Sequence, residues 1–87
     1  MTTLDVLKAI QRLTIEKLIA KSELVIAVYA RPHRRELSIF VQDKDYVVLA
    51  HEIFVDDNSI DFRKQNEEAY KRVLDAIEKH DSVSLAG

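Results

Sequence analysis

The stretch that decides the fold is residues 24–55, which read LVIAVYA (24–30), RPHRR (31–35), ELSIFVQ (36–42), DKD (43–45) and YVVLAHEIFV (46–55). Three runs of strand length, which are either fully apolar or alternate apolar with polar residues, are separated by two short polar connections. This pattern predicts three antiparallel β-strands in a meander, over residues 24–30, 36–42 and 46–55. The first run contains no polar residue, which is typical of a strand covered on both faces. We therefore expect this first strand to lie at the centre of the sheet.

Side chains alternate between the two faces of a strand, so the three runs also predict what each face of the sheet carries. The first face is aliphatic and is expected to form the main core, with Leu24, Ile26, Val28, Leu37, Ile39, Val41, Val47, Leu49, His51, Ile53 and Val55. The second face is aromatic and small, with Val25, Ala27, Tyr29, Phe40, Tyr46, Val48 and Phe54. Both faces are apolar, so both need a cover.

The segment before the sheet is predicted to be helical. Residues 4–20 repeat apolar side chains at helical spacing, and Thr3 is the expected N-cap. Thr14, a β-branched residue in the middle of this segment, leaves a second interpretation open. It could cap the second of two shorter helices.

The segment after the sheet is predicted to be a second helix, over residues 60–80. It carries one apolar stripe opposite a charged face, and Asn58 or Ser59 is the expected cap. Residues 82–87 are expected to be a frayed tail. The expected fold is therefore a single two-layer α+β domain over the whole chain, in the order helix, three-stranded antiparallel meander, helix (αβββα).

Composition narrows the class of protein. The chain has 87 residues, a formal net charge of −2 and no Cys, which points to one domain without disulfides. No apolar run reaches the ~18 residues of a transmembrane helix. The N-terminal residues also lack the basic and then apolar layout of a signal peptide. We therefore expect a cytoplasmic protein.

Candidate chemistry is weak along the whole chain. Asp57, Ser59, Asp61 and Glu68 follow part of a calcium-loop pattern, but Phe62 occupies the position that needs Gly. The three His residues have no ligand spacing, and the single Gly excludes the usual phosphate loops. The expectation is therefore no enzyme, no metal and no cofactor.

The second face of the sheet leaves two arrangements open. If the two helices cover opposite faces, no large apolar surface is exposed. If both helices pack on the first face, the second face becomes a larger patch than soluble monomers usually show. We expect the second arrangement, with the patch binding another protein or a second copy in a homodimer. The expected contact residues are Tyr29, Phe40, Tyr46, Val48 and Phe54, with Arg31, Arg34 and Arg35 at the rim.

These features favour a small non-enzymatic protein-binding module that acts as a regulator, inhibitor or adaptor. Two observations favour this function: the sequence has no catalytic motif, and it predicts more apolar sheet surface than the core needs. Small single-domain proteins of this kind include anti-defence inhibitors carried by phages and mobile elements, and a phage protein of that type is the closest analogy.

A basic turn gives the alternative function. Residues 31–35 bring three Arg side chains into one turn, which can bind a phosphate or an acidic partner. Arg31-Pro32-His33 is similar to the Gly-Pro-x-His loop of the double-stranded-RNA-binding domain, and the order of elements resembles that family over most of the chain. The resemblance implies contact of this turn with the RNA minor groove, and of Arg63 and Lys64 with phosphate. The family's Gly and its Lys-Lys-x-x-Lys helix start are absent, so duplex binding is the alternative.

Overall fold

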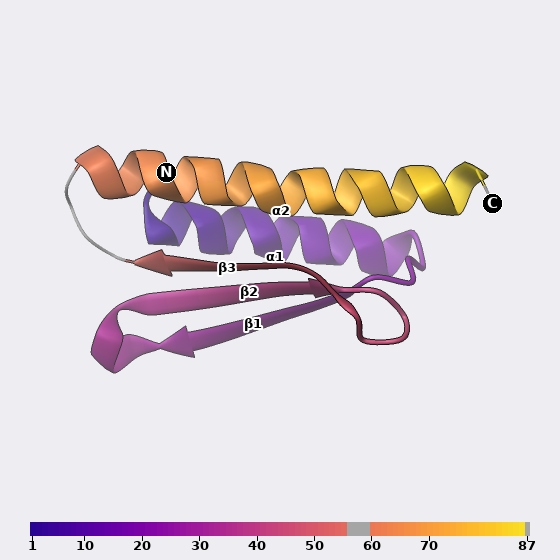
Figure 1. Cartoon of the computed structure of the whole chain (residues 1–87). Helices are drawn as coiled ribbons and strands as arrows, with labels where there is room; N and C mark the ends of the chain where they lie inside the picture. Colours follow the sequence, from indigo (N-terminus) through magenta and orange to yellow (C-terminus); the bar gives the residue numbers. More distant parts are fainter. Residues whose placement is uncertain (56–59, 87) are drawn as a thin grey trace.

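The computed structural model describes the backbone of residues 1–55 and 60–86. It describes the side chains of residues 1–55 and 61–82. It has the expected order of a helix, three antiparallel strands and a second helix (Figure 1). The αβββα prediction is therefore confirmed. The elements are α1 (Thr3–Ile19), β1 (Val25–Arg31), a 3₁₀ turn (Pro32–Arg34), β2 (Glu36–Gln42), β3 (Val48–Val55) and α2 (Ile60–Ala86).

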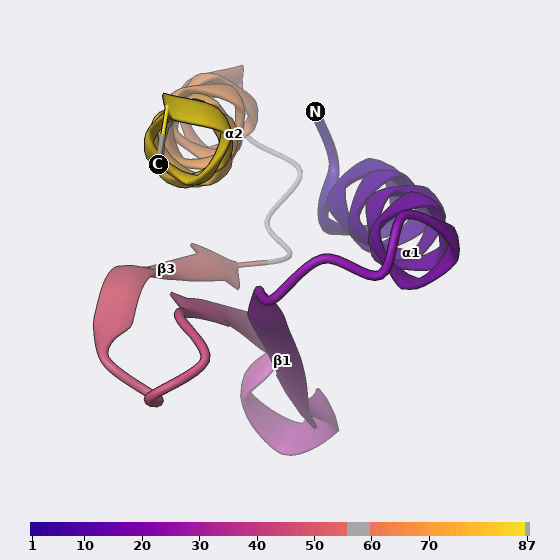
Figure 2. The ribbon, with the colours of Figure 1, turned by 90° about the vertical axis from the view of Figure 1, so that its right-hand side faces the viewer.

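The three strands form one sheet, and both helices lie on the same side of it. Figure 2, which looks along the helices, places α1 and α2 in one layer and the sheet in a second layer. The strand order is β1-β2-β3, so β2 is the central strand and β1 is an edge strand. The expectation that the first strand is central was wrong, because a meander always places its middle strand at the centre. The apolar character of β1 therefore needs another explanation.

The helix α1 is a single continuous helix that begins one residue earlier than expected. Its N-cap is Thr2, whose Oγ1 accepts from the Asp5 N–H at 3.2 Å, while the Thr2 N–H donates to Asp5 Oδ2 at 3.0 Å. Thr14 does not start a second helix. Its hydroxyl donates to the Ile10 carbonyl oxygen at 2.7 Å, which satisfies a β-branched polar residue inside the helix.

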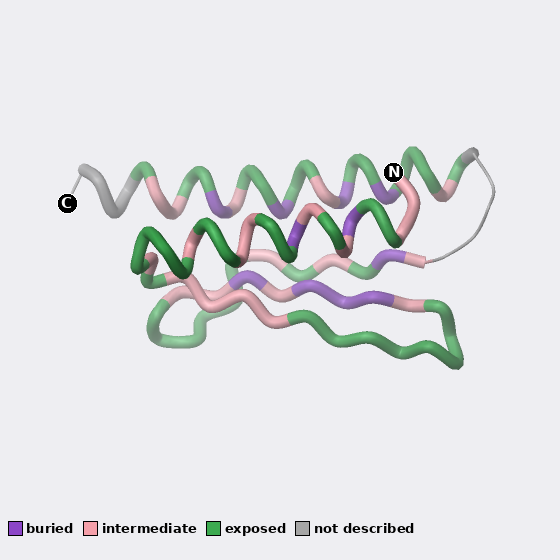
Figure 3. Tube along the Cα trace, turned by 180° about the vertical axis from the view of Figure 1, so that it is seen from behind, coloured by how far each residue is buried: buried purple, intermediate pink, exposed green. Residues whose placement is uncertain are grey.

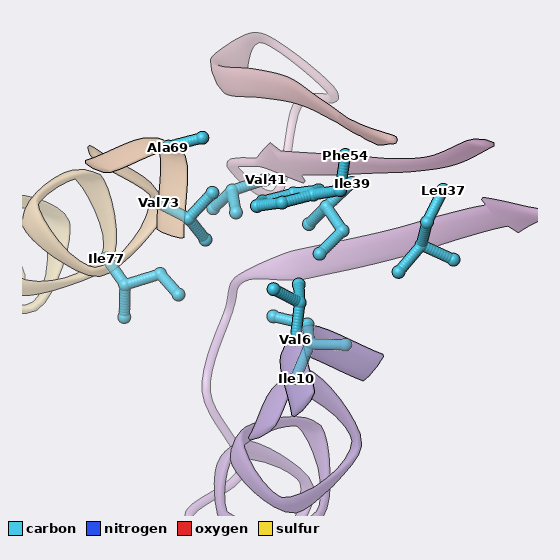
Figure 4. Close-up of a cluster of buried hydrophobic side chains, with 9 residues drawn as sticks. All are labelled: Val6, Ile10, Leu37, Ile39, Val41, Phe54, Ala69, Val73 and Ile77. Atoms are coloured by element: carbon cyan, nitrogen blue, oxygen red, sulfur yellow. The ribbon is translucent and has the colours of Figure 1, made fainter. Parts of the chain in front are cut away.

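The core lies entirely between the helix layer and the facing side of the sheet (Figures 3 and 4). Each fully buried aliphatic or aromatic side chain contributes about 1.5–3 kcal/mol relative to an exposed one, so this layer accounts for most of the stability. The buried apolar residues are Val6 and Ile10 of α1, Leu37, Ile39 and Val41 of β2, Phe54 of β3, and Ala69, Val73 and Ile77 of α2.

The third strand faces the helices with the opposite set of residues from the one predicted. Its register pairs Leu37 with Phe54 and Val41 with Ala50, so Phe54 faces the helices and is 0% exposed. The residues assigned to the first face on this strand, including His51 and Ile53, therefore do not contribute to the core. The alternation was predicted correctly from Ala50 to Val55, but the sequence pattern does not state which set of residues faces the helices. Val48 pairs with Gln42 beyond the register shift, so it lies on the same side as His51 and Ile53.

A loop accounts for this register. The residues from Asp43 to Val47 connect β2 to β3, so Tyr46 and Val47 precede the strand instead of beginning it. Asp43 Oδ1 accepts from the N–H groups of Asp45 and Val47 at 2.8 and 3.0 Å, and Tyr46 takes a left-handed backbone with a φ of 64°. A register shift at Val41/Gln42 completes the change.

The second helix continues well past the expected end at His80. It runs to Ala86, so the expected frayed tail is helical over most of its length. No Gly or Pro occurs between residue 80 and Gly87, so nothing in this stretch stops the helix. An ion pair connects the helix to β3, with Arg72 Nε and Nη2 donating to the Glu52 carboxylate at 2.6 and 3.2 Å. The expected caps, Asn58 and Ser59, lie outside the described residues.

Candidate protein-interaction face

The side of the sheet that faces away from the helices carries apolar and aromatic side chains without a covering layer. We call this surface the open face and define it as Val25, Ala27, Tyr29, Phe40, Val48, His51 and Ile53. Tyr29, Val48 and Ile53 are 58%, 52% and 51% exposed. Figure 2 shows both helices on the other side of the sheet. Of the two arrangements left open by the sequence, the structure has the one with both helices on one face.

The open face has an aromatic centre. The register places Ala27, Phe40 and His51 in one row across the three strands. The rings of Phe40 and His51 stack with centroids 3.9 Å apart and planes inclined by 9°, and the Tyr29 ring meets Phe40 edge-on at 5.7 Å. Aromatic contacts of this kind contribute about 0.5–1.5 kcal/mol beyond their area, so the cluster fixes three rings in defined positions. It therefore presents a preorganised surface.

The structure brings together some of the predicted contact residues and separates others. Tyr29, Phe40 and Val48 lie on the open face as expected. Tyr46 is 69% exposed but belongs to the β2–β3 loop, because its left-handed backbone ends the strand pattern. The placement of Phe54 on this face was wrong, because its side chain belongs to the core on the helix side.

Two residues of the open face, His51 and Ile53, were assigned to the core from the sequence. The signal that could have found them is the chemistry of their strand. An aromatic Phe54 and a small Ala50 fit beneath helices, whereas a polar His51 suits an uncovered surface.

The three Arg residues of the turn do not form one cluster. Arg31 lies on the side of the open face, opposite Glu36, with its Nη1 4.0 Å from Glu36 Oε2. Arg35 takes a left-handed backbone with a φ of 52° and lines a hollow on the helix side, beside Thr3 and Leu4. Of the three Arg residues predicted at the rim, the contacts in the described part of the chain therefore place Arg31 alone on the open face.

In the described residues, neither a group of metal ligands nor a membrane-spanning helix is found. Within residues 1–55 and 60–86, no three side chains of His, Cys, Asp or Glu are placed to hold a metal ion. Asp57 and Ser59 of the calcium-loop pattern lie outside that part of the chain. In the same ranges, no helix has both the length and the apolar character that crossing a bilayer requires.

Comparisons with known proteins add no relative. No family model, no curated protein and no solved structure matches this chain. The resemblance to the double-stranded-RNA-binding domain therefore rests on the order of the elements and on the residues of the turn.

Proposed function

We propose that the protein is a non-enzymatic protein-binding module whose open face receives a partner protein. One observation carries this proposal: both helices cover the same face of a three-stranded sheet, so the aromatic face opposite has no cover within the described residues. Apolar surfaces of this extent on soluble proteins usually mark interaction sites. A regulator, inhibitor or adaptor role, of the kind that small phage proteins perform, fits a surface that binds without chemistry.

The chemistry of the open face defines the partner surface that would fit it. Tyr29 and Phe40 are the expected anchors, because aromatic side chains held in place lose little conformational entropy on binding. Ile53 and Val48 add half-exposed aliphatic area beside them. A complementary partner would present an apolar centre of matching area.

Charge is divided between the two ends of the sheet and would orient the partner. Arg31 and the exposed Arg34 lie at the end with the β1–β2 turn, while the exposed Asp45 lies in the β2–β3 loop at the opposite end (Figure 1). A partner with carboxylates at one edge of its apolar patch would bind in one direction only. Rim charges of this kind affect the association rate and specificity more than the affinity.

Capture of proteins from a lysate of the source cells tests the proposal when wild-type protein is compared with two variants. Ile53→Asp places a charge on the open face, and Leu74→Asp places the same charge on α2, where Leu74 is 37% exposed. We expect at least one protein to bind the wild type and Leu74→Asp but not Ile53→Asp. The same set of captured proteins for all three, or none, would contradict the proposal.

A specific observation also favours the alternative, duplex nucleic-acid binding. The β1–β2 turn with Arg34 and Arg35 lies at the same end of the molecule as the start of α2 with Arg63 and Lys64 (Figure 1). The N-terminus lies there too, with the Met1 ammonium donating to the Arg63 carbonyl oxygen at 3.3 Å. These positive charges could contact phosphates on one side of a duplex.

Fluorescence anisotropy with a labelled RNA duplex of about 16 base pairs, the span of a double-stranded-RNA-binding domain, tests this alternative. Binding should weaken steeply as the salt concentration rises, and the double variant Arg34→Glu/Arg35→Glu should abolish it. Lys44→Glu, at the opposite end of the molecule, is the matched control. The absence of binding at low salt would exclude this function.

A further inference from the structure

The outer edge of β1 is unusually unprotected. Within the described residues, no strand pairs with this edge. From Val25 to Ala30 the strand contains no charged residue and no Pro, which are features that natural proteins use to blunt an edge. The other edge strand, β3, carries His51 and Glu52 at its middle and an ion pair to α2. The edge of β1 is therefore the one suited to pairing with another chain.

The helix layer above β1 is also incomplete. Val28 faces the helix side, opposite Ile39, yet it is 38% exposed. Leu18 of α1 is 72% exposed and lines a hollow of about 180 Å³ together with Leu24 and Ile26. An apolar strip between α1 and β1 therefore has no cover from the residues that the structure describes.

A second hollow continues this strip at the other end of β1. Leu4 is 58% exposed and lines that hollow with Leu7 and Ala30. Leu4, Leu7, Thr14 and Leu18 follow helical spacing, so they form one stripe along α1 that borders both hollows. A further strand beside β1 would lie beneath this stripe.

We propose that a second copy of this chain pairs with β1 in antiparallel fashion, so that two three-stranded sheets join into one six-stranded sheet. The two-fold axis passes between the Ala27 residues of the two copies. In this register Val25 lies opposite Tyr29 of the second copy, and Ile26 lies opposite Val28 of the second copy. The exposed Val28 thereby gains an apolar cross-strand neighbour on the helix side.

Charge selects this register over its neighbours. With the axis at Ala27, Glu23, two residues before β1, would come level with Arg31 of the second copy, so each Arg31 would have a Glu23 nearby as well as Glu36 of its own chain. Moving the axis to Ile26 places Arg31 beyond the start of the second copy's β1, level with the turn that contains Lys21, so no carboxylate faces it. Moving the axis to Val28 places Arg31 opposite Val25, so Arg31 no longer has the Glu23 carboxylate nearby. Opposite charges on directly facing strand residues stabilise a pair, and like charges destabilise it.

Pairing at the edge leaves the open face uncovered. The rows of Ala27, Phe40 and His51 from the two copies would meet at the axis and form one continuous aromatic band. The dimer would therefore present twice the surface that we propose for partner binding. Edge pairing is independent of that function, because it depends on β1, α1 and the charges at the ends of β1.

Cysteine cross-linking tests the register directly, because the chain contains no Cys. Ala27→Cys places two thiols opposite each other at the axis. In Val25→Cys the two thiols are displaced by four residues along the strands, about 13 Å. A disulfide needs Cα atoms within about 7 Å, so oxidation should link Ala27→Cys on the order of tenfold faster or more than Val25→Cys. Equal rates, or no link at Ala27→Cys, would overturn the proposed register.

Light scattering on a size-exclusion column tests which surface makes the dimer. The wild type should have twice the 10.0 kDa mass of the chain. Val28→Lys should be a folded monomer by circular dichroism, because a Lys on the edge strand opposes pairing. Ile53→Lys, on the open face, should keep the doubled mass. A monomeric wild type would overturn the proposal, as would a dimer lost in Ile53→Lys and kept in Val28→Lys, which indicates stacking of open faces.

Discussion

Single residues with a left-handed backbone mark the connections of this chain. Its one Gly is residue 87, so Lys21, Arg35 and Tyr46 adopt positive φ values of 55°, 52° and 64° at positions where Gly is usual. Lys21 follows α1, where the Ser22 N–H donates to the Lys17 carbonyl oxygen at 3.0 Å and the Lys21 N–H donates to that of Leu18 at 3.1 Å. This is the hydrogen-bond pattern of a Schellman motif, which favours Gly at the position of Lys21.

Lys21→Gly should therefore stabilise the protein. Removing the side chain relieves the left-handed conformation, and we expect the free energy of unfolding to rise by about 0.5–1 kcal/mol. Lys8→Gly, at an exposed position inside α1, is the control and should lower it by about 1 kcal/mol. Urea unfolding followed by circular dichroism measures both. A loss of stability in Lys21→Gly would argue against the left-handed turn.

At the scale of elements, the sequence predicts the kinds of element and most of their bounds. Apolar periodicity identifies both helices and all three strands, because burial on one side forces a period of 3.6 or 2. It does not identify which side of β3 faces the helices. The five residues from Asp43 to Val47 and the shift at Val41/Gln42 decide that, and both depend on backbone conformations that apolar periodicity does not encode. The same limit explains why Phe54 and Ile53 were assigned to the wrong faces.

The ends of the two helices are connected by an ion pair that should make stability depend on pH. Lys17 of α1 donates to the Asp81 carboxylate of α2, and His80 lies beside the same carboxylate. The hydrogen bond from Lys17 is the main cause that lowers the pKa of Asp81 from its ordinary value of 3.8. A lowered pKa means that the contribution to stability is complete above the unfolded value and is lost as the pH falls through the folded value.

Asp81→Asn should therefore lower the free energy of unfolding at pH 7 by about 0.5–1 kcal/mol, the range of a partly exposed pair. The difference from the wild type should begin to shrink below about pH 4, where the carboxyl group of the unfolded chain binds a proton, and it should disappear once the pH falls below the lowered pKa of the folded state. Urea unfolding at several pH values measures it, and Asp75→Asn, an exposed position on α2, is the control. A difference that is constant from pH 7 to pH 3 would exclude the ion pair as its cause.

The whole molecule is asymmetric: one side of the sheet is covered by two helices and the other side is open (Figures 2 and 3). The sequence predicted an apolar second face and named Tyr29, Phe40 and Val48 in it, because alternation within β1 and β2 fixes those positions. It missed His51 and Ile53, which depend on the register of β3. The predicted meander already implied that the most apolar strand is an edge, because a meander places its middle strand at the centre, and the expectation of a central first strand overlooked this.

Both proposed interaction surfaces depend on which face of the sheet is open, and one measurement separates the two possibilities. Ile53 and Ile39 were assigned to the same face from the sequence, but in the structure Ile53 is 51% exposed and Ile39 is 0% exposed. Urea unfolding of Ile53→Asp and Ile39→Asp compares the two positions. We predict that Ile53→Asp folds and loses less than about 2 kcal/mol, because its charge remains in water, whereas Ile39→Asp does not fold because its charge is buried. Equal and severe loss of stability in both variants would mean that Ile53 lies in the core, and the open face would not exist.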